Sequence, residues 1–329
     1  MILIITSKQD GHIGAVARYF DAAGVPWVRI NTEDFAMNID LTVAPADGYA
    51  TLWVRDSGRT VDLQNVRAVW FRKPEPVSVS HFTGCDPGAL DYIEAEFTEI
   101  LFGIYGLLRH AYWINDPFST RIAHRKMLQL RVAANVGWAT PRTVITNNAE
   151  TALDFARRLP GDVAIKSLGA ISVSEPSDDG GLIQYGLFTR RVTVPELEAA
   201  KETIRYQPTV FQEFLERRYE LRITCIGGSC FACRIDSRES DLTVDDYRFD
   251  TKGLLHTPQH CPPELEHKLR TYMEAFGLKF GCFDVMVTKS GEAVFLECNP
   301  NGQWLWVEEM TGMPIAQAIA EQLMSACTA

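Results

Sequence analysis

Oxygen-bearing side chains gather in one short stretch near the end of the 329-residue chain. Two runs of alternating residues flank Ser290 and Gly291, and this pair predicts a two-residue hairpin turn. In that register Asp284 lies directly opposite Glu297, and Asn299 shares the face of Glu297 because strand side chains alternate with period two. A three-residue turn would shift the register by one and separate the acids. Carboxylate and amide oxygens without thiol or imidazole favour Mg²⁺.

The alternative is an exposed hairpin whose acids are merely solvated. Against it, the neighbouring residues Phe283, Val285, Phe295 and Leu296 are strongly apolar, so the acids interrupt a largely buried sheet. A metal site is therefore the preferred interpretation.

A magnesium ion that bridges nucleotide phosphates is expected to have cationic neighbours, because Lys and Arg also stabilise charge on a transferred phosphoryl group. Lys166 ends an apolar strand, just before a Gly-, Ser- and Asp-rich stretch over 168–186 that predicts a mobile loop. Lys126 lies on a helix expected over 121–135. A lone lysine at a strand end is usually a solvated charge, so the two lysines carry weight only together.

A second hairpin turns at the Gly-Gly pair 227–228, which is a strong turn signal. Its register places Arg222 opposite Cys233 and Glu220 opposite Ile235. Arg222 and Glu220 therefore share one face of the sheet.

The elements that position these residues begin with a strand, a helix and a strand within residues 1–30. The first turn, Asp10-Gly11-His12-Ile13-Gly14, lacks the G-x-G-x-x-G spacing, so no dinucleotide site is expected there. We predict an α/β protein of three units: an N-terminal domain over 1–117, a central domain over 118–208, and a C-terminal domain with the metal hairpin over 209–329.

Composition narrows the function classes. With 32 Lys and Arg against 42 Asp and Glu the net charge is −10, which argues against a nucleic-acid or anionic-membrane partner. No apolar run approaches the roughly 20 residues of a membrane span, and no signal peptide is visible. The 8 cysteines are expected to be free thiols, and the expected location is the cytoplasm.

In the order of these elements the chain resembles the ATP-grasp carboxylate ligases over nearly its whole length. The resemblance implies that the segment Gln212-Glu213-Phe214-Leu215 holds adenine, through Glu213 and the Leu215 backbone, and that Glu220 meets the ribose. It further implies roles for the charged residues: Lys126 and Lys166 at the ATP phosphates, Arg222 and Arg248 at phosphate or an acyl phosphate, and Asp284, Glu297 and Asn299 at Mg²⁺.

Within that superfamily, the ending Asn299-Pro300-Asn301-Gly302-Gln303-Trp304 looks like the graspetide ligases, which make microviridin-type omega-ester and omega-amide peptides. The segments Trp70-Phe71-Arg72-Lys73-Pro74 and Asp245-Asp246-Tyr247-Arg248 support this resemblance, whereas the loop after Lys166 is less glycine-rich than a typical grasp loop. The resemblance implies an ATP-grasp fold with a βαβ N-terminal domain and two α+β units that clasp ATP. It also implies a ribosomal precursor peptide, with leader and core, as partner, and a homo-oligomer.

The implied reaction is phosphorylation of an Asp or Glu side chain of the peptide, followed by attack of a Ser or Thr hydroxyl or a Lys amine, which closes a macrolactone or macrolactam. One alternative is a ligase for free amino acids or protein glutamylation, which the tryptophan-containing ending disfavours. Another is a nucleotide-binding module without catalysis, which two lysines and three metal ligands disfavour. The sequence alone does not identify the general base for the attacking hydroxyl.

Overall fold

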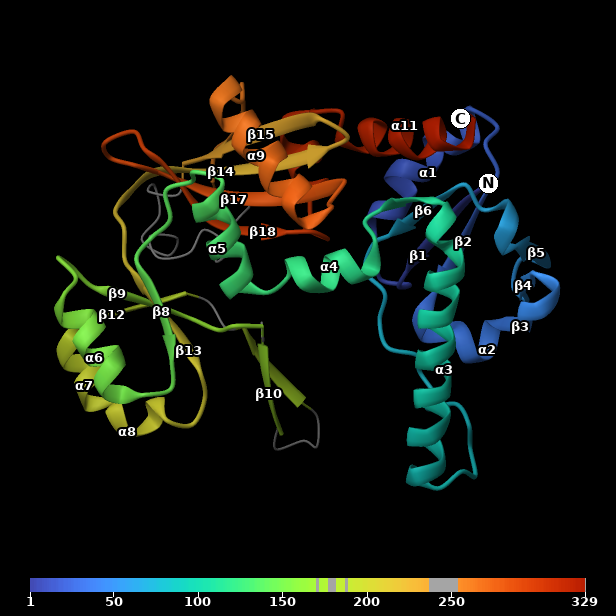
Figure 1. Cartoon of the computed structure of the whole chain (residues 1–329), viewed down its shortest axis with the longest axis horizontal. Helices are drawn as coiled ribbons and strands as arrows, with labels where there is room; N and C mark the ends of the chain where they lie inside the picture. Colours follow the sequence, from blue (N-terminus) through green and yellow to red (C-terminus); the bar gives the residue numbers. More distant parts are fainter. Residues whose placement is uncertain (170–171, 177–181, 187–188, 237–253, 329) are drawn as a thin grey trace.

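The computed structural model describes residues 1–169, 172–176, 182–186, 189–236 and 254–328. Three groups of elements are visible in Figure 1, each built on a sheet of four or five strands. The N-terminal group lies at one end of the molecule, and the central and C-terminal groups lie together at the other. Within these described ranges, no helix has both the length and the apolar character needed to cross a membrane.

The N-terminal sheet is parallel, as the predicted strand–helix–strand opening requires. Its order is β2 (Trp27–Asn31), β1 (Ile2–Thr6), β6 (Ala68–Phe71) and β7 (Tyr112–Ile114). Ile2 and Ile4 on β1 pack toward α1 (His12–Ala22) and α11 (Ile315–Thr328). Leu3 and Ile5 point to the other face, toward α3 (Pro87–Leu107). The C-terminal helix α11 therefore covers one face of the N-terminal sheet (Figure 1).

A small antiparallel sheet that the sequence patterns did not predict packs on the α3 side of the same core. It comprises β3 (Ile39–Ala44), β4 (Tyr49–Val54) and β5 (Arg59–Asp62), and follows the short helix α2 (Phe35–Asn38).

The central sheet has the order β12, β9, β13, β8 and is antiparallel. Its strands are β8 (Thr143–Thr146), β9 (Val163–Lys166), β12 (Arg190–Val192) and β13 (Thr209–Glu213), and α6 (Ala149–Arg157), α7 (Val194–Ala199) and α8 (Lys201–Ile204) pack against it. The loop predicted over 168–186 is wrong in its described parts. β10 (Ser172–Pro176) and β11 (Leu182–Gly186) form an antiparallel pair there.

The C-terminal sheet has five antiparallel strands in the order β16, β15, β14, β17, β18. They are β14 (Arg217–Ile226), β15 (Ser229–Ile235), β16 (His256–Gln259), β17 (Phe280–Thr288) and β18 (Ala293–Asn299). One face is covered by α9 (Pro263–Phe276) and by α4 (Pro117–Ala123) and α5 (Lys126–Asn135), while α10 (Leu305–Thr311) leads from the sheet to α11.

The prediction of a single helix over 121–135 is wrong. Two helices, α4 and α5, are separated by His124 and Arg125, and the extended backbone of Arg125 interrupts the helical hydrogen bonding. Not all of the apolar residues in these two helices face the core. Ile122 and Met127 are 54% and 56% exposed, whereas Gln129 is buried.

The predicted domain boundaries stay predictions. β13, at 209–213, pairs with the central sheet rather than the C-terminal one. α4 and α5 pack on the C-terminal sheet. Sheet membership therefore favours a central unit that begins near Arg142 and ends at Glu213.

Candidate active site

The hairpin of β17 and β18 brings Asp284 directly opposite Glu297, as predicted. The predicted two-residue turn is nevertheless wrong. The Thr288 amide donates to the Glu292 carbonyl at 3.0 Å, so three residues form the turn. Such a turn shifts the register by one residue and, alone, would have separated the two acids.

A β-bulge in β18 restores their pairing. Val285 pairs with Phe295, whereas the next pair is Asp284 with Glu297, so Leu296 is the extra residue. A bulge places two residues of one strand against one residue of the other, and this shift cancels that of the turn. The acids therefore face each other because two irregularities compensate.

Each acid of the hairpin is bound by one of the predicted cations. Arg222 lies on β14, directly opposite Asp284 of β17. Its Nη1 donates to both carboxylate oxygens of Asp284, at 2.8 and 2.9 Å. Lys126 Nζ lies 3.4 Å from Glu297 Oε2. The Asn299 amide donates to Glu297 Oε1 at 3.4 Å. The structure thus brings together these five predicted residues from four elements.

The segment after Asn299 returns beneath Arg222. Arg222 Nη2 donates to the Gln303 carbonyl at 2.9 Å. Gly302 permits this approach, because a Cβ there would lie 2.3 Å from Cys282 Cβ and 3.0 Å from Arg222 Nη2. The glycine of the Asn-Pro-Asn-Gly-Gln-Trp ending therefore has a steric role beside the arginine.

One buried amide joins the α4–α5 junction to the hairpin. Gln129 Nε2 donates to the carbonyls of Ala123 (2.6 Å) and Cys298 (2.8 Å), and its Oε1 accepts from the Cys298 amide at 3.0 Å. Lys126 lies on the same helix as Gln129, and Glu297 directly precedes Cys298. The Gln129 hydrogen bonds therefore hold Lys126 and Glu297 near each other. Sequence reasoning missed Gln129; its signal is a glutamine on a helix face that otherwise buries alanine.

The predicted adenine segment links the central sheet to the C-terminal one. Gln212 is buried on β13, accepts from Lys166 Nζ at 2.8 Å and donates to Thr143 Oγ1 at 3.0 Å. Lys166 and Gln212 are therefore in direct contact on the paired strands β9 and β13. Phe214 and Leu215 follow β13 and lie half-buried before β14 begins.

Glu213 has a partner that the sequence did not reveal. Arg142 donates from Nε and Nη2 to the two Glu213 carboxylate oxygens, both at 3.0 Å, in a bidentate pair. This hydrogen bonding lowers the pKa of Glu213, so the carboxylate is ionised at neutral pH.

The register of β14 and β15 places Glu220 and Arg222 as predicted. Glu220 is buried opposite Ile235, as predicted, and accepts from Arg217 Nη1 at 2.8 Å. Arg222 pairs with Cys233, also as predicted. Arg248 lies outside the described residues.

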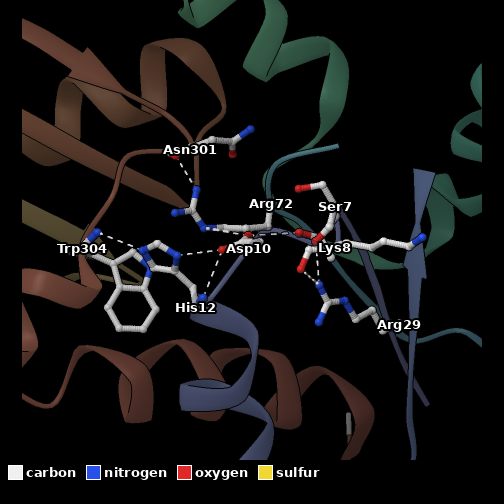
Figure 2. Close-up of polar contacts among 9 residues, drawn as sticks. Ser7, Lys8, Asp10, His12, Arg29, Arg72, Asn301 and Trp304 are labelled. Carbon is white, nitrogen blue, oxygen red and sulfur yellow. Dashed lines mark hydrogen bonds and ion pairs between the residues drawn. The ribbon is translucent and has the colours of Figure 1, made fainter. Parts of the chain in front are cut away.

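A buried polar network joins the N-terminal sheet to the hairpin's end (Figure 2). Asp10 accepts from the His12 ring Nδ1 at 2.7 Å and lies 3.7 Å from Arg72 Nε. Arg72, only 1% exposed, donates from Nη1 to the Asn301 carbonyl. The Trp304 amide donates to His12 Nε2 at 3.4 Å. The two segments that suggested a graspetide ligase, 70–74 and 299–304, are thus in direct contact.

Protonation in this network follows from burial and charge. Burial by itself would raise the pKa of Asp10, but the His12 hydrogen bond and the Arg72 charge outweigh it, so the pKa lies well below its usual range. Burial also lowers the pKa of His12, more than its bond to Asp10 raises it. At neutral pH, Asp10 is therefore ionised and His12 neutral.

We expect Asp10→Asn to lower the free energy of unfolding by about 3–5 kcal/mol at pH 7, because Arg72 then stays buried without its carboxylate. The folded pKa is lowered, so the stabilisation by Asp10 is complete above the unfolded value of about 4 and declines as the pH falls below it. Urea unfolding of both proteins between pH 7 and pH 3.5 measures this. An equal difference at every pH, or none, contradicts the prediction.

Known proteins of similar sequence and structure identify the family. A family model described as the MvdD pre-ATP grasp domain matches residues 1–121. The structure of macrocyclase MdnB from Microcystis aeruginosa MRC is 30% identical over 98% of this chain and 98% of that one, with a TM-score of 0.78. This chain belongs to the ATP-grasp graspetide ligases.

Two further structures of these ligases are similar over nearly their full length. A RiPP-associated ATP-grasp ligase from Chryseobacterium gregarium, in complex with ADP and a leader and core peptide, is 27% identical over 98% of this chain and 96% of that one, with a TM-score of 0.89. Macrocyclase MdnC of Microcystis aeruginosa MRC, bound with precursor peptide MdnA, is 27% identical over 98% and 99%, with a TM-score of 0.84. No curated protein matches this chain.

The donor set fits the cofactors expected of an ATP-grasp graspetide ligase. Asp284 and Glu297 retain 14% and 25% exposure, so their oxygens are accessible to an ion. Two carboxylates and one amide oxygen match Mg²⁺, which takes few protein ligands and completes its shell with phosphate oxygens and water. Arg222 and Lys126, now paired with the acids, are the cations that phosphates would also contact.

Proposed function

We propose that this chain is an ADP-forming ligase that joins a side-chain carboxylate of a ribosomal precursor peptide to a hydroxyl or amine of the same peptide. The observation that carries the proposal is the pairing of Asp284 with Glu297, each bound by a cation, in a member of the graspetide ligases. Relatives that bind ADP and precursor peptides support it.

Each part of ATP would be bound by different residues. Glu213 and the Leu215 backbone would bind adenine, Glu220 the ribose, and Lys166 with Lys126 the phosphates. Asp284, Glu297 and Asn299 would hold Mg²⁺, which when bound neutralises phosphate charge.

Arg222 would stabilise the phosphoryl group as it moves to the peptide carboxylate, and Arg248 is proposed beside it. Activation is needed because phosphate is a far better leaving group than oxide or hydroxide. The attacking hydroxyl or amine then displaces phosphate and closes the ring.

Several properties of the protein remain part of this proposal: a homo-oligomer, a cytoplasmic location, and the absence of a nucleic-acid partner. The free cysteines of the described residues agree with a cytoplasmic location. The net charge of −10 agrees with the absence of a nucleic-acid partner.

Mass spectrometry tests the proposal directly. A candidate precursor peptide, rich in Thr or Ser and in Asp or Glu, is incubated with the protein, ATP and Mg²⁺. We expect the loss of one water per bond formed, with one ADP per bond. A peptide with Asn and Gln in place of Asp and Glu is the matched control and should stay unmodified.

The other outcomes decide between the alternatives. Mild alkaline hydrolysis that regains the lost water identifies esters, and resistance identifies amides. ADP release driven by free amino acids, with unmodified peptide, would instead indicate a small-molecule ligase. No nucleotide turnover with any acceptor would indicate a binding module.

A further inference from the structure

Ring closure needs a proton acceptor that the residues assigned so far do not provide. When a hydroxyl attacks the acyl phosphate, its proton must leave. Arg222 and Lys126 are cations, and Asp284 and Glu297 are paired with them and assigned to the metal. A side chain that serves as the acceptor would lie beside the hairpin, outside these ion pairs and accessible to the peptide.

His124 occupies such a place. It follows Ala123, the last residue of α4, and lies two residues before Lys126. Gln129 binds the Ala123 carbonyl on one side and both backbone groups of Cys298 on the other, at 2.6 to 3.0 Å. Residue 124 is thus held beside the strand that carries Glu297, by hydrogen bonds that are themselves buried.

The imidazole of His124 is available to a substrate. The side chain is exposed, and within the described part of the chain its ring makes no hydrogen bond or ion pair. The histidine rings of the network in Figure 2 and of His110, by contrast, already have partners.

The charges around His124 come from three elements. Arg125 adjoins it, Lys73 follows β6, and Glu297 lies on β18. Loss of hydration among the surrounding atoms lowers the pKa of His124, and Arg125 and Lys73 lower it further, while Glu297 acts in the opposite direction. The imidazole is therefore neutral at pH 7 and can accept a proton.

We propose that His124 is the general base of ring closure, an assignment that rests on the proposed function. A ring nitrogen of His124 takes the hydroxyl proton while the oxygen forms a bond to the acyl carbon. The bond from that carbon to the phosphate oxygen breaks, and phosphate leaves with its electron pair. The imidazolium then returns its proton to solvent.

Hydroxylamine separates the two half-reactions. It is a strong nucleophile that captures an acyl phosphate as a hydroxamate without needing a general base. We expect His124→Gln to form hydroxamate and ADP at the wild-type rate in its presence. Without hydroxylamine, ring closure should fall by about 10²–10⁴-fold, the usual contribution of a general base. His124→Asn is the second variant, in case the first does not fold.

The control is His267→Gln, which changes an exposed histidine on α9 and should alter neither product. Rings formed by both His124 variants at the wild-type rate would overturn the assignment. An equal fall of hydroxamate and rings would also overturn it, because His124 would then act in phosphorylation or folding. If the wild-type protein forms neither product, the proposed function itself fails.

Discussion

Asp284→Asn is expected to lower the rate of ADP formation with peptide by at least about a hundredfold, a typical effect of losing one preorganised charge interaction in an active site. The change removes the negative charge that would bind Mg²⁺ and that accepts two hydrogen bonds from Arg222 Nη1. We also expect a higher Mg²⁺ concentration at half-maximal rate, because a neutral amide oxygen is a weaker ligand than a carboxylate. Titration with Mg²⁺ at saturating ATP measures both effects.

A matched control for this substitution is Glu264→Gln on α9, which also removes one negative charge. Glu264 is 83% exposed and pairs with Lys268 at 3.2 Å, so its loss should leave the rate unchanged. Thermal unfolding of each variant shows whether the site is intact. A folded Asp284→Asn protein with the wild-type rate and the wild-type Mg²⁺ dependence would contradict the assignment of Asp284 to the metal.

Trp304→Ala is expected to lower the free energy of unfolding by about 3–5 kcal/mol, the usual effect of truncating a buried aromatic residue. Trp304 is 0% exposed, and its ring packs edge-on against His12 with 5.1 Å between ring centroids. It belongs to the core shared by β1, α1 and α11. At about 2–4 °C per kcal/mol, the melting temperature should fall by roughly 10 °C.

Trp53→Ala tests whether this loss depends on burial. Trp53 lies on β4 and is 43% exposed, so we expect its truncation to cost less than about 1 kcal/mol. Calorimetry or urea unfolding compares the two variants. Equal destabilisation of the two variants would contradict the prediction that burial of Trp304 causes the loss.

Much of the local structure was predictable because its causes are local. The Gly-Gly turn set the register that places Arg222 opposite Cys233. Alternation predicted the strands of the β17–β18 hairpin. Short-range periodicity and turn chemistry suffice for such elements.

The pairing of Asp284 with Glu297 was predicted correctly from an incorrect turn. A bulge at Leu296 has no clear sequence signal, since the residue continues the apolar pattern of the strand. It is the packing of the hairpin against β14 and its neighbours that selects the register in which apolar residues face the core.

The sequence by itself determined the chemistry: which residues carry carboxylates, amides and cations, and which strands and helices present them. Only the tertiary structure decided that Gln129 holds α5 to β18 and that Arg72 binds the Asn301 carbonyl, 229 positions away. It also decided that α11 closes the first sheet. These contacts join residues far apart in the chain, so no periodicity or spacing records them. They form only when buried polar groups must find partners and each sheet must cover its apolar face.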